Sequence, residues 1–176
     1  NEHQIEESQK AVAKMEVIIG DPDRLRAVAE DFIKHYETRV AEGATVAGKA
    51  MFVCSNRNIA YDFYKIVKEL RPKWTEKKIC DDGVVLSEKD KKELKPMEKI
   101  KLVMTRNKDD EKDLFDMLGT KEDRKEFDRQ FKNPKSNFKI AIVVDMWLTG
   151  FDVPELDTIY IDKPIQQHTL IQTISR

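Results

Sequence analysis

The chain has 176 residues, of which 37% are charged, and its 32 lysines and arginines nearly balance its 33 aspartates and glutamates. A net charge of −1 excludes a global field that would attract polyanions or anionic lipid, so any contact with nucleic acid must be local. The length suits one well-filled domain.

The cysteine, histidine and hydropathy patterns narrow the class further. Cys54 and Cys80 lie far apart and form no C-x-x-C pair, which is typical of reduced thiols rather than of a disulfide framework or a zinc site. The three histidines are scattered, so no metal site is predicted. No apolar run approaches the ~18 residues that cross a bilayer, and the chain opens without a signal-peptide pattern. These features predict a soluble, cytoplasmic protein without membrane contact.

The first 48 residues predict a helical lead-in to the domain. Asp21 is placed to be an N-cap and Pro22 to be the first helical residue. Apolar residues then recur at steps of three to four and form one stripe: Leu25, Val28, Phe32, Tyr36 and Val40. The chain begins at Asn1 without an initiator methionine and stops at Arg176 within "HTLIQTISR", which has the pattern of an unfinished helix. We therefore expect a fragment of a longer polypeptide.

The next elements alternate between strands and helices. "KAMFVC", residues 49–54, predicts a short buried strand that ends at a polar turn of Ser55, Asn56 and Arg57. An amphipathic helix follows, with Ala60, Phe63, Val67 and Leu70 as its buried stripe, and Pro72 stops it. Residues 73–98 are polar, rich in lysine and weakly periodic, and they are interpreted as an insertion.

The second half of the chain repeats the alternation. "KIKLVMT" from Lys99 predicts a strand, "NKDDEKDLFDML" a loop or short helix, and "KEDRKEFDRQF" a helix with Phe127 and Phe131 facing inward. The strands "KIAIVV" and "TIYI" follow, and a terminal helix is predicted from about Gln166. The charge runs "SEKDKKELK" and "NKDDEKD" are typical of solvated faces.

This alternation predicts an α/β fold in which a parallel sheet is flanked by helices in three layers, because parallel strands need crossover connections. In such sheets, ligands bind beyond the carboxyl ends of the strands. Polar groups follow Cys54, Met104 and Val144, and Asp162 ends "TIYI". All of them are expected at that edge.

Two interpretations of "LTGFDVP", residues 148–154, are open. Gly150 supplies a permissive φ, Asp152 can cap a backbone amide and Pro154 starts an extended segment, so a structural turn accounts for it. The acids, hydroxyl and glycine beside an apolar strand are equally typical of a binding loop. Arg176 by itself is consistent with a surface arginine at a helix end. The chain lacks G-x-x-x-x-G-K-[ST], G-x-G-x-x-G and a nucleophile elbow, so a complete catalytic apparatus is not predicted.

Residues 49–176 as a whole resemble the second RecA-like domain of superfamily 2 helicases and translocases, a P-loop NTPase-like fold without a Walker A motif. The phrases "LTGFDVP", "YIDKP" and "LIQTISR" are most similar to the motor subunit of type I restriction enzymes, the R subunit. The residues that fall in the family's order and spacing are Arg124, Phe131, Asp145, Gly150, Asp152, Pro154, Asp162, Pro164, Gln172 and Arg176.

The resemblance assigns roles to particular residues. It implies that Gly150, Asp152 and Gln172 contact ATP in a cleft between two RecA-like domains. It implies that Arg176, one helical turn after Gln172, stabilises the charge of the transferring phosphoryl group as a catalytic arginine. Ser55, Asn56 and Arg57 stand where the family's fourth motif contacts the DNA backbone. The family's second arginine would follow Arg176, so this chain alone is expected neither to bind ATP and Mg²⁺ nor to hydrolyse ATP.

For the full-length protein the resemblance implies an ATP-hydrolysing type I site-specific deoxyribonuclease that translocates double-stranded DNA. Its partners would be the modification (methyltransferase) and specificity subunits and the first RecA-like domain of the same chain. Two alternatives stay open. One is another superfamily 2 DNA or RNA helicase or translocase. The other is a non-catalytic α/β interaction module that kept the fold, which would tolerate loss of Gly150 and Asp152.

Overall fold

A mixed sheet forms the centre of the molecule. The computed structural model describes residues 2–144, 156–162 and 169–173, and the strand order in its main sheet is β4-β5-β1-β6-β7. Strands β4 (Ile100–Leu102), β5 (Ile140–Val144), β1 (Lys49–Cys54) and β6 (Leu156–Asp162) are parallel. Strand β7 (Thr169–Thr173) pairs with β6 in the antiparallel direction. The predicted α/β fold with a helix-flanked parallel sheet is confirmed for these four strands.

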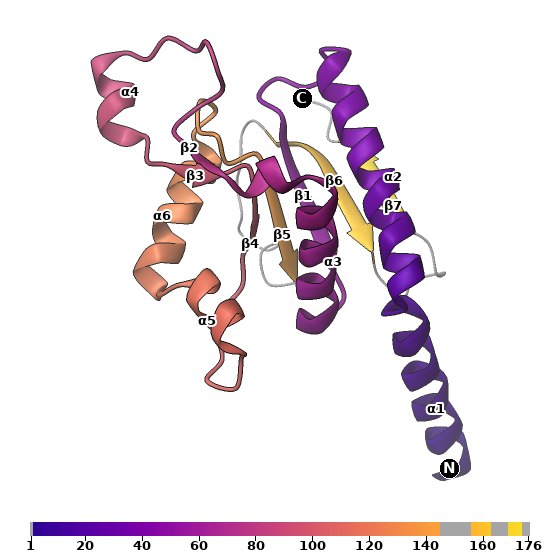
Figure 1. The fold of residues 1–176 in the computed structure, drawn as a ribbon. Helices are drawn as coiled ribbons and strands as arrows, with labels where there is room; N and C mark the ends of the chain where they lie inside the picture. Colours follow the sequence, from indigo (N-terminus) through magenta and orange to yellow (C-terminus); the bar gives the residue numbers. More distant parts are fainter. Residues whose placement is uncertain (1, 145–155, 163–168, 174–176) are drawn as a thin grey trace.

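At β1 the sheet is buried on both faces, which explains why this strand consists of six consecutive buried residues. Ala50, Phe52 and Cys54 pack in one core cluster with residues of α2 (Pro22–Ala41) and α3 (Arg57–Leu70). Met51 and Val53 alternate with them and pack in a second cluster with Phe131 of α6 (Lys121–Lys132). Figure 1 shows α2 and α3 in front of the sheet and α6 beside β4. The inward placement predicted for Phe127 and Phe131 is confirmed.

Two long helices precede the sheet in the chain. Helix α1 (Glu2–Ile19) projects beyond the sheet, and α2 continues from its end in nearly the same direction and lies along the sheet (Figure 1). Asp21 is the N-cap residue of α2 and Pro22 is its first residue, but the Asp21 side chain makes no capping hydrogen bond. Leu25, Phe32 and Tyr36 of the predicted stripe are buried, whereas Val40 is exposed because it lies in the last turn. None of the described helices is both long and apolar enough to span a membrane.

Residues 73–98, which the sequence predicts to be an insertion, contain short helices and strands. After α3, a short 3-10 helix η1 (Pro72–Thr75) leads into a two-stranded antiparallel ribbon of β2 (Lys77–Lys78) and β3 (Met97–Glu98). Helix α4 (Glu88–Glu93) lies between the two strands and has a capping box formed by Ser87 and Asp90. Helix α5 (Lys112–Leu118) follows β4 and ends at Gly119, whose φ of 73° favours glycine. The stretch predicted to be a loop or short helix is therefore a helix in its second half.

The prediction of a terminal helix from about Gln166 is wrong for residues 169–173, which form β7. Thr169, Ile171 and Thr173 are β-branched and favour a strand, and the free edge of β6 supplies a hydrogen-bonding partner. Gln172 is paired with Ile159 in this strand, so the helical relation expected between Gln172 and Arg176 does not hold at Gln172. The antiparallel pairing also fixes the direction of β7, which begins beside Asp162 of β6 and ends beside Thr158.

A lysine is buried at the start of β1. Lys49 is 1% exposed, and its Nζ donates to the Phe138 carbonyl at 2.5 Å and lies 5.3 Å from the centre of the Phe131 ring. Burial, and next the charge of Lys139, lowers the pKa of Lys49 to about 6. Unfolded lysine keeps its proton until about pH 10.4, so folding at pH 7 must remove a proton from Lys49.

Replacing Lys49 by methionine is therefore expected to raise the free energy of unfolding at pH 7. Removing the deprotonation cost of about 4–5 kcal/mol outweighs the roughly 1–3 kcal/mol lost when the Phe138 carbonyl loses its donor. Between pH 7 and 9.5 the deprotonation cost shrinks, so the advantage of Lys49→Met should vanish near pH 9.5. Urea denaturation at the two pH values measures this. An equal difference at both would show that Lys49 stays charged in the folded chain.

Candidate functional site

The carboxyl ends of three parallel strands lie side by side. Cys54, the last residue of β1, is in register with Val144 of β5 on one side and Asp162 of β6 on the other. The polar residues that follow β1 therefore start beside the end of β6, as the sequence predicts. Burial, reinforced by the charge of Asp162, raises the pKa of the Cys54 thiol. The side chain of Cys54, at the carboxyl edge of the sheet, is therefore a neutral thiol.

Asp162 is held by an arginine from the lead-in. Two nitrogens of the Arg24 guanidinium contact the two carboxylate oxygens of Asp162 at 2.9 and 2.7 Å, and Asp162 is only 2% exposed. Arg24 belongs to the first turn of α2, and its Nε donates to the carbonyl of Ile19, the last residue of α1. The sequence alone does not predict this arginine to be part of the site. Its position in a helix 138 residues before its partner gives no local signal.

The three residues predicted to contact DNA follow β1 directly. Asn56 is the N-cap of α3, and its side-chain oxygen accepts a hydrogen bond from the Ile59 amide at 2.9 Å. Arg57 begins α3, and its Nη2 contacts both carboxylate oxygens of Asp110 at 2.8 and 2.6 Å. Its Nη1 donates to the Thr105 carbonyl. Ser55 is partly buried between β1 and this cap. The local structure thus fixes the backbone of the turn and the direction of the Arg57 side chain.

Asp110 corrects one prediction. The sequence predicts a solvated face for the run "NKDDEKD", but the Asp110 side chain is only 10% exposed because it binds Arg57. Partial burial opposes its ionisation, yet hydrogen bonds from Arg57 and from the Asn107 amide outweigh this effect and lower the pKa of Asp110. Asp110 therefore brings the loop after β4 to the same edge as the turn after β1.

Most of the residues predicted to form the ATP site lie outside the part of the chain that the structure describes. Gly150, Asp152 and Arg176 lie outside the described residues. Gln172 lies on β7, and only its backbone pairing is described. In the sequence, Gly150 and Asp152 come shortly after Val144, the residue at which β5 reaches the carboxyl edge. In the described part of the chain, no three histidine, cysteine or acidic side chains are grouped closely enough to hold a metal ion.

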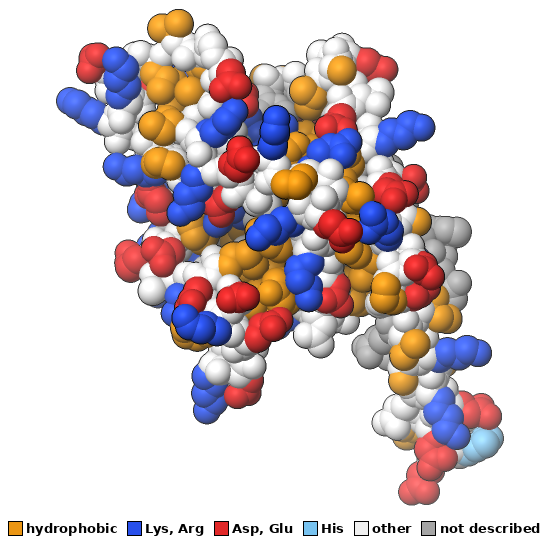
Figure 2. Space-filling view, viewed as in Figure 1, with side chains coloured by type: hydrophobic (Ala, Val, Ile, Leu, Met, Phe, Trp, Pro, Cys, Tyr) orange, Lys and Arg blue, Asp and Glu red, His pale blue; other side chains and the backbone are white. Residues whose placement is uncertain are grey.

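The charge on the visible surface is mixed. Figure 2 shows basic and acidic side chains interspersed over the visible face, in keeping with the balanced composition. A hollow of about 760 Å³ lies between α4 and α6 and is lined mainly by charged side chains, among them Lys92, Lys95 and Arg129. It reaches Lys135, shortly before the start of β5, and so lies on the amino-terminal side of the sheet. It is separate from the carboxyl edge.

Comparison with known proteins identifies relatives. Residues 46–176 match the family model described as type I restriction enzyme subunit R domain 3. The chain is 34% identical over 97% of its length to the type I restriction enzyme HindI endonuclease subunit of Haemophilus influenzae. It is 36% identical over its whole length to a protein of Methanocaldococcus jannaschii named as a candidate type I restriction enzyme MjaIXP endonuclease subunit. It spans 14% of the length of each relative.

The family model covers most of the chain, including the whole main sheet and the insertion. Residues 1–45, with α1 and α2, precede the matched region. The chain therefore belongs to the family of type I restriction enzyme subunit R, domain 3.

Proposed function

We propose that this chain is the second RecA-like domain of the motor in a type I restriction enzyme R subunit. In the full-length protein it would contribute half of an ATP site and part of the track for double-stranded DNA. The modification and specificity subunits and the first RecA-like domain would be its partners. The names of the relatives, which are endonuclease subunits, support a nuclease activity of the longer polypeptide.

One observation carries the proposal: the strand register at the carboxyl edge. The turn with Ser55, Asn56 and Arg57 leaves β1 there, β6 reaches it at Asp162, and β5 reaches it at Val144, the residue at which the description of that strand ends. Two described segments that resemble superfamily 2 motifs, the turn after β1 and the end of β6, thus lie at the edge where open α/β sheets bind ligands.

The charges at this edge bear on how ATP and Mg²⁺ would be held. Arg24 and Arg57 are each paired with a carboxylate, so neither supplies an unpaired cation to the phosphates. Protein-bound Mg²⁺ often needs only one or two carboxylates in addition to phosphate oxygens and water, so a large metal cluster is not required. ATP would supply the phosphoryl group whose transfer powers movement. Asp152 and Gly150 would position it, and Arg176 together with the first domain would supply the positive charge.

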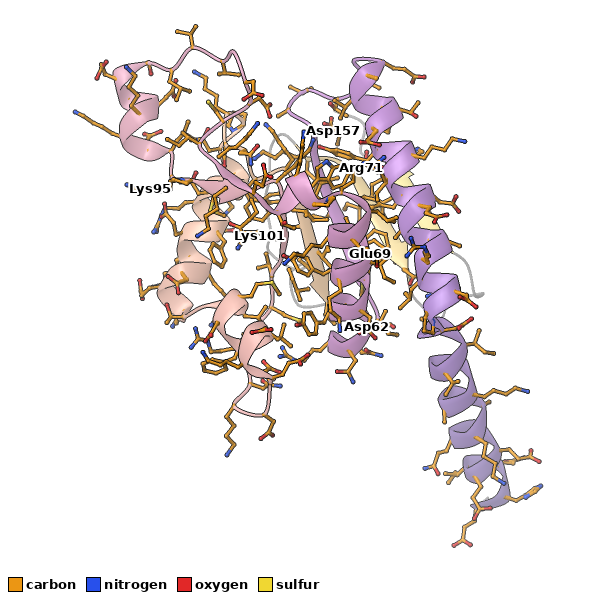
Figure 3. The ribbon with its side chains drawn as sticks, viewed as in Figure 1. Asp62, Glu69, Arg71, Lys95, Lys101 and Asp157 are labelled. Atoms are coloured by element: carbon orange, nitrogen blue, oxygen red, sulfur yellow. The ribbon has the colours of Figure 1, made fainter. Side chains whose placement is uncertain are left out.

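Replacing Asp152 by alanine in the full-length polypeptide tests the proposal. DNA-stimulated ATP hydrolysis is expected to fall about a hundredfold, because loss of a positioning contact misaligns the nucleotide. The matched control is Asp62→Ala. Asp62 lies on α3 (Figure 3), is about half exposed, and pairs only loosely with Lys65 at 3.4 Å. Wild-type hydrolysis by the Asp152 variant would show that this segment is a structural turn.

A further inference from the structure

The carboxylate of Asp162 lies within the residues that match the family model, but its bidentate partner comes from a helix that precedes the match and packs on the same core. Asp162 ends β6, whereas Arg24 lies in the segment that precedes residue 46, where the family match begins. Removing one partner from a buried ion pair leaves an uncompensated charge and is strongly destabilising. The lead-in therefore completes the electrostatics of the domain at its carboxyl edge.

The same guanidinium also holds the junction between the two lead-in helices. Its Nε contacts the carbonyl of Ile19 at 2.9 Å, and Ile19 is 3% exposed. Only Gly20 and Asp21 separate α1 from α2. Arg24 thus connects the end of α1, the first turn of α2 and the end of β6. Because α1 extends beyond the body of the domain (Figure 1) and ends at Ile19, a change in its direction would move the carbonyl that Arg24 contacts.

We propose that the Arg24–Asp162 pair is a coupling joint between the lead-in helices and the carboxyl edge, and that Arg24 is a positioning residue for the nucleotide site. This inference rests on the proposed function, which places ATP at this edge. The bidentate geometry fixes both the distance and the orientation of the two elements. A buried pair of this kind adds little net stability compared with apolar residues of similar size, so specifying geometry is the role that suits it.

The test separates geometry from stability. In the full-length polypeptide, Arg24→Met removes the bidentate partner of the buried Asp162 carboxylate and should lower both thermal stability and ATP turnover. The double variant Arg24→Met/Asp162→Leu removes both charges and should recover most of the stability. If the pair positions the edge, ATP turnover by the double variant stays about threefold to thirtyfold below wild type. Recovery of wild-type turnover together with stability would overturn the proposal.

A second readout does not depend on hydrolysis. Amide hydrogen exchange of residues 18–25 is measured with and without the non-hydrolysable analogue adenylyl imidodiphosphate and Mg²⁺. Coupling is reciprocal, so the analogue should slow exchange at this joint in the wild type and leave the double variant unchanged. An equal response in both proteins would overturn the proposal.

A matched ion pair on the same helix serves as the control. Arg71, at the end of α3 (Figure 3), contacts Glu37 of α2 at 2.8 and 3.1 Å, and both side chains are more than 40% exposed. Arg71→Met/Glu37→Leu should keep wild-type turnover, and an equal loss there would overturn a specific role for Arg24.

A wild type that does not hydrolyse ATP would reject the proposed function. Amide hydrogen exchange of residues 18–25, measured without nucleotide, would then test the coupling joint by itself. Faster exchange in Arg24→Met/Asp162→Leu than in the wild type would support the joint, and equal exchange would overturn it.

Discussion

Replacing Arg176 by alanine in the full-length polypeptide is expected to lower DNA-stimulated ATP turnover about a thousandfold or more, with DNA binding retained. The magnitude is that of removing an arginine that stabilises the charge on a transferring phosphoryl group. Arg176→Lys should recover little, because an ammonium lacks the planar, multidentate guanidinium. Steady-state hydrolysis at saturating ATP and DNA measures the effect on kcat, and circular dichroism verifies the fold.

This experiment also decides between two arrangements of the end of the chain. Strand β7 begins beside Asp162 at the carboxyl edge and ends beside Thr158, so it runs away from the proposed nucleotide site. A catalytic Arg176 requires the chain after Asp162 to leave this pairing and return to the carboxyl edge. Undiminished turnover by Arg176→Ala, together with loss in Asp152→Ala, would mean that the end of the chain keeps its place beside β6 and that another arginine serves the reaction.

Replacing Phe52 by alanine should have the largest effect on stability, a loss of about 3–5 kcal/mol in the free energy of unfolding. Phe52 is fully buried at the centre of β1. Its ring stacks on Phe63 with centroids 3.9 Å apart and meets Phe32 edge-on at 5.2 Å. The cavity would therefore open where β1, α2 and α3 meet, and their rigid packing limits how far the site can collapse.

Denaturation in urea measures the loss, and Phe115→Ala provides the control. Phe115 on α5 is only partly buried, and Arg106 lies over its ring at 3.9 Å. Replacing Phe115 by alanine should lower the free energy of unfolding by clearly less than replacing Phe52 does. Equal costs for the two variants would contradict the view that the aromatic cluster around Phe52 is the main source of packing energy.

Most of the fold could be predicted because its signals are local. The six-residue apolar run of β1, the stripe of α3 and the proline after it each define an element without knowledge of its neighbours. The last strand could not be predicted in this way. "TLIQT" is short and has no periodicity that separates helix from strand, so its state depends on the unpaired edge of β6, which only the folded sheet presents.

The candidate site was predictable in position but not in its contacts. Ser55, Asn56 and Arg57 follow an apolar strand, which is a local signal for the carboxyl edge. That Arg57 binds Asp110 and that Arg24 binds Asp162 depends on pairs 53 and 138 residues apart, which no spacing rule relates. Lys49 is a related case, because its burial follows from the packing of Phe131 and Phe138 around it rather than from its own hydropathy.

ATP-driven movement along DNA tests the central claim most directly. The measurement is displacement of a third-strand oligonucleotide from duplex DNA by the assembled enzyme, prepared with wild-type or Asp152→Ala R subunit. We expect ATP-dependent displacement by the wild type and none by the variant, although both bind the duplex equally. Displacement by the variant at the wild-type rate would contradict a motor role for the carboxyl edge of this domain.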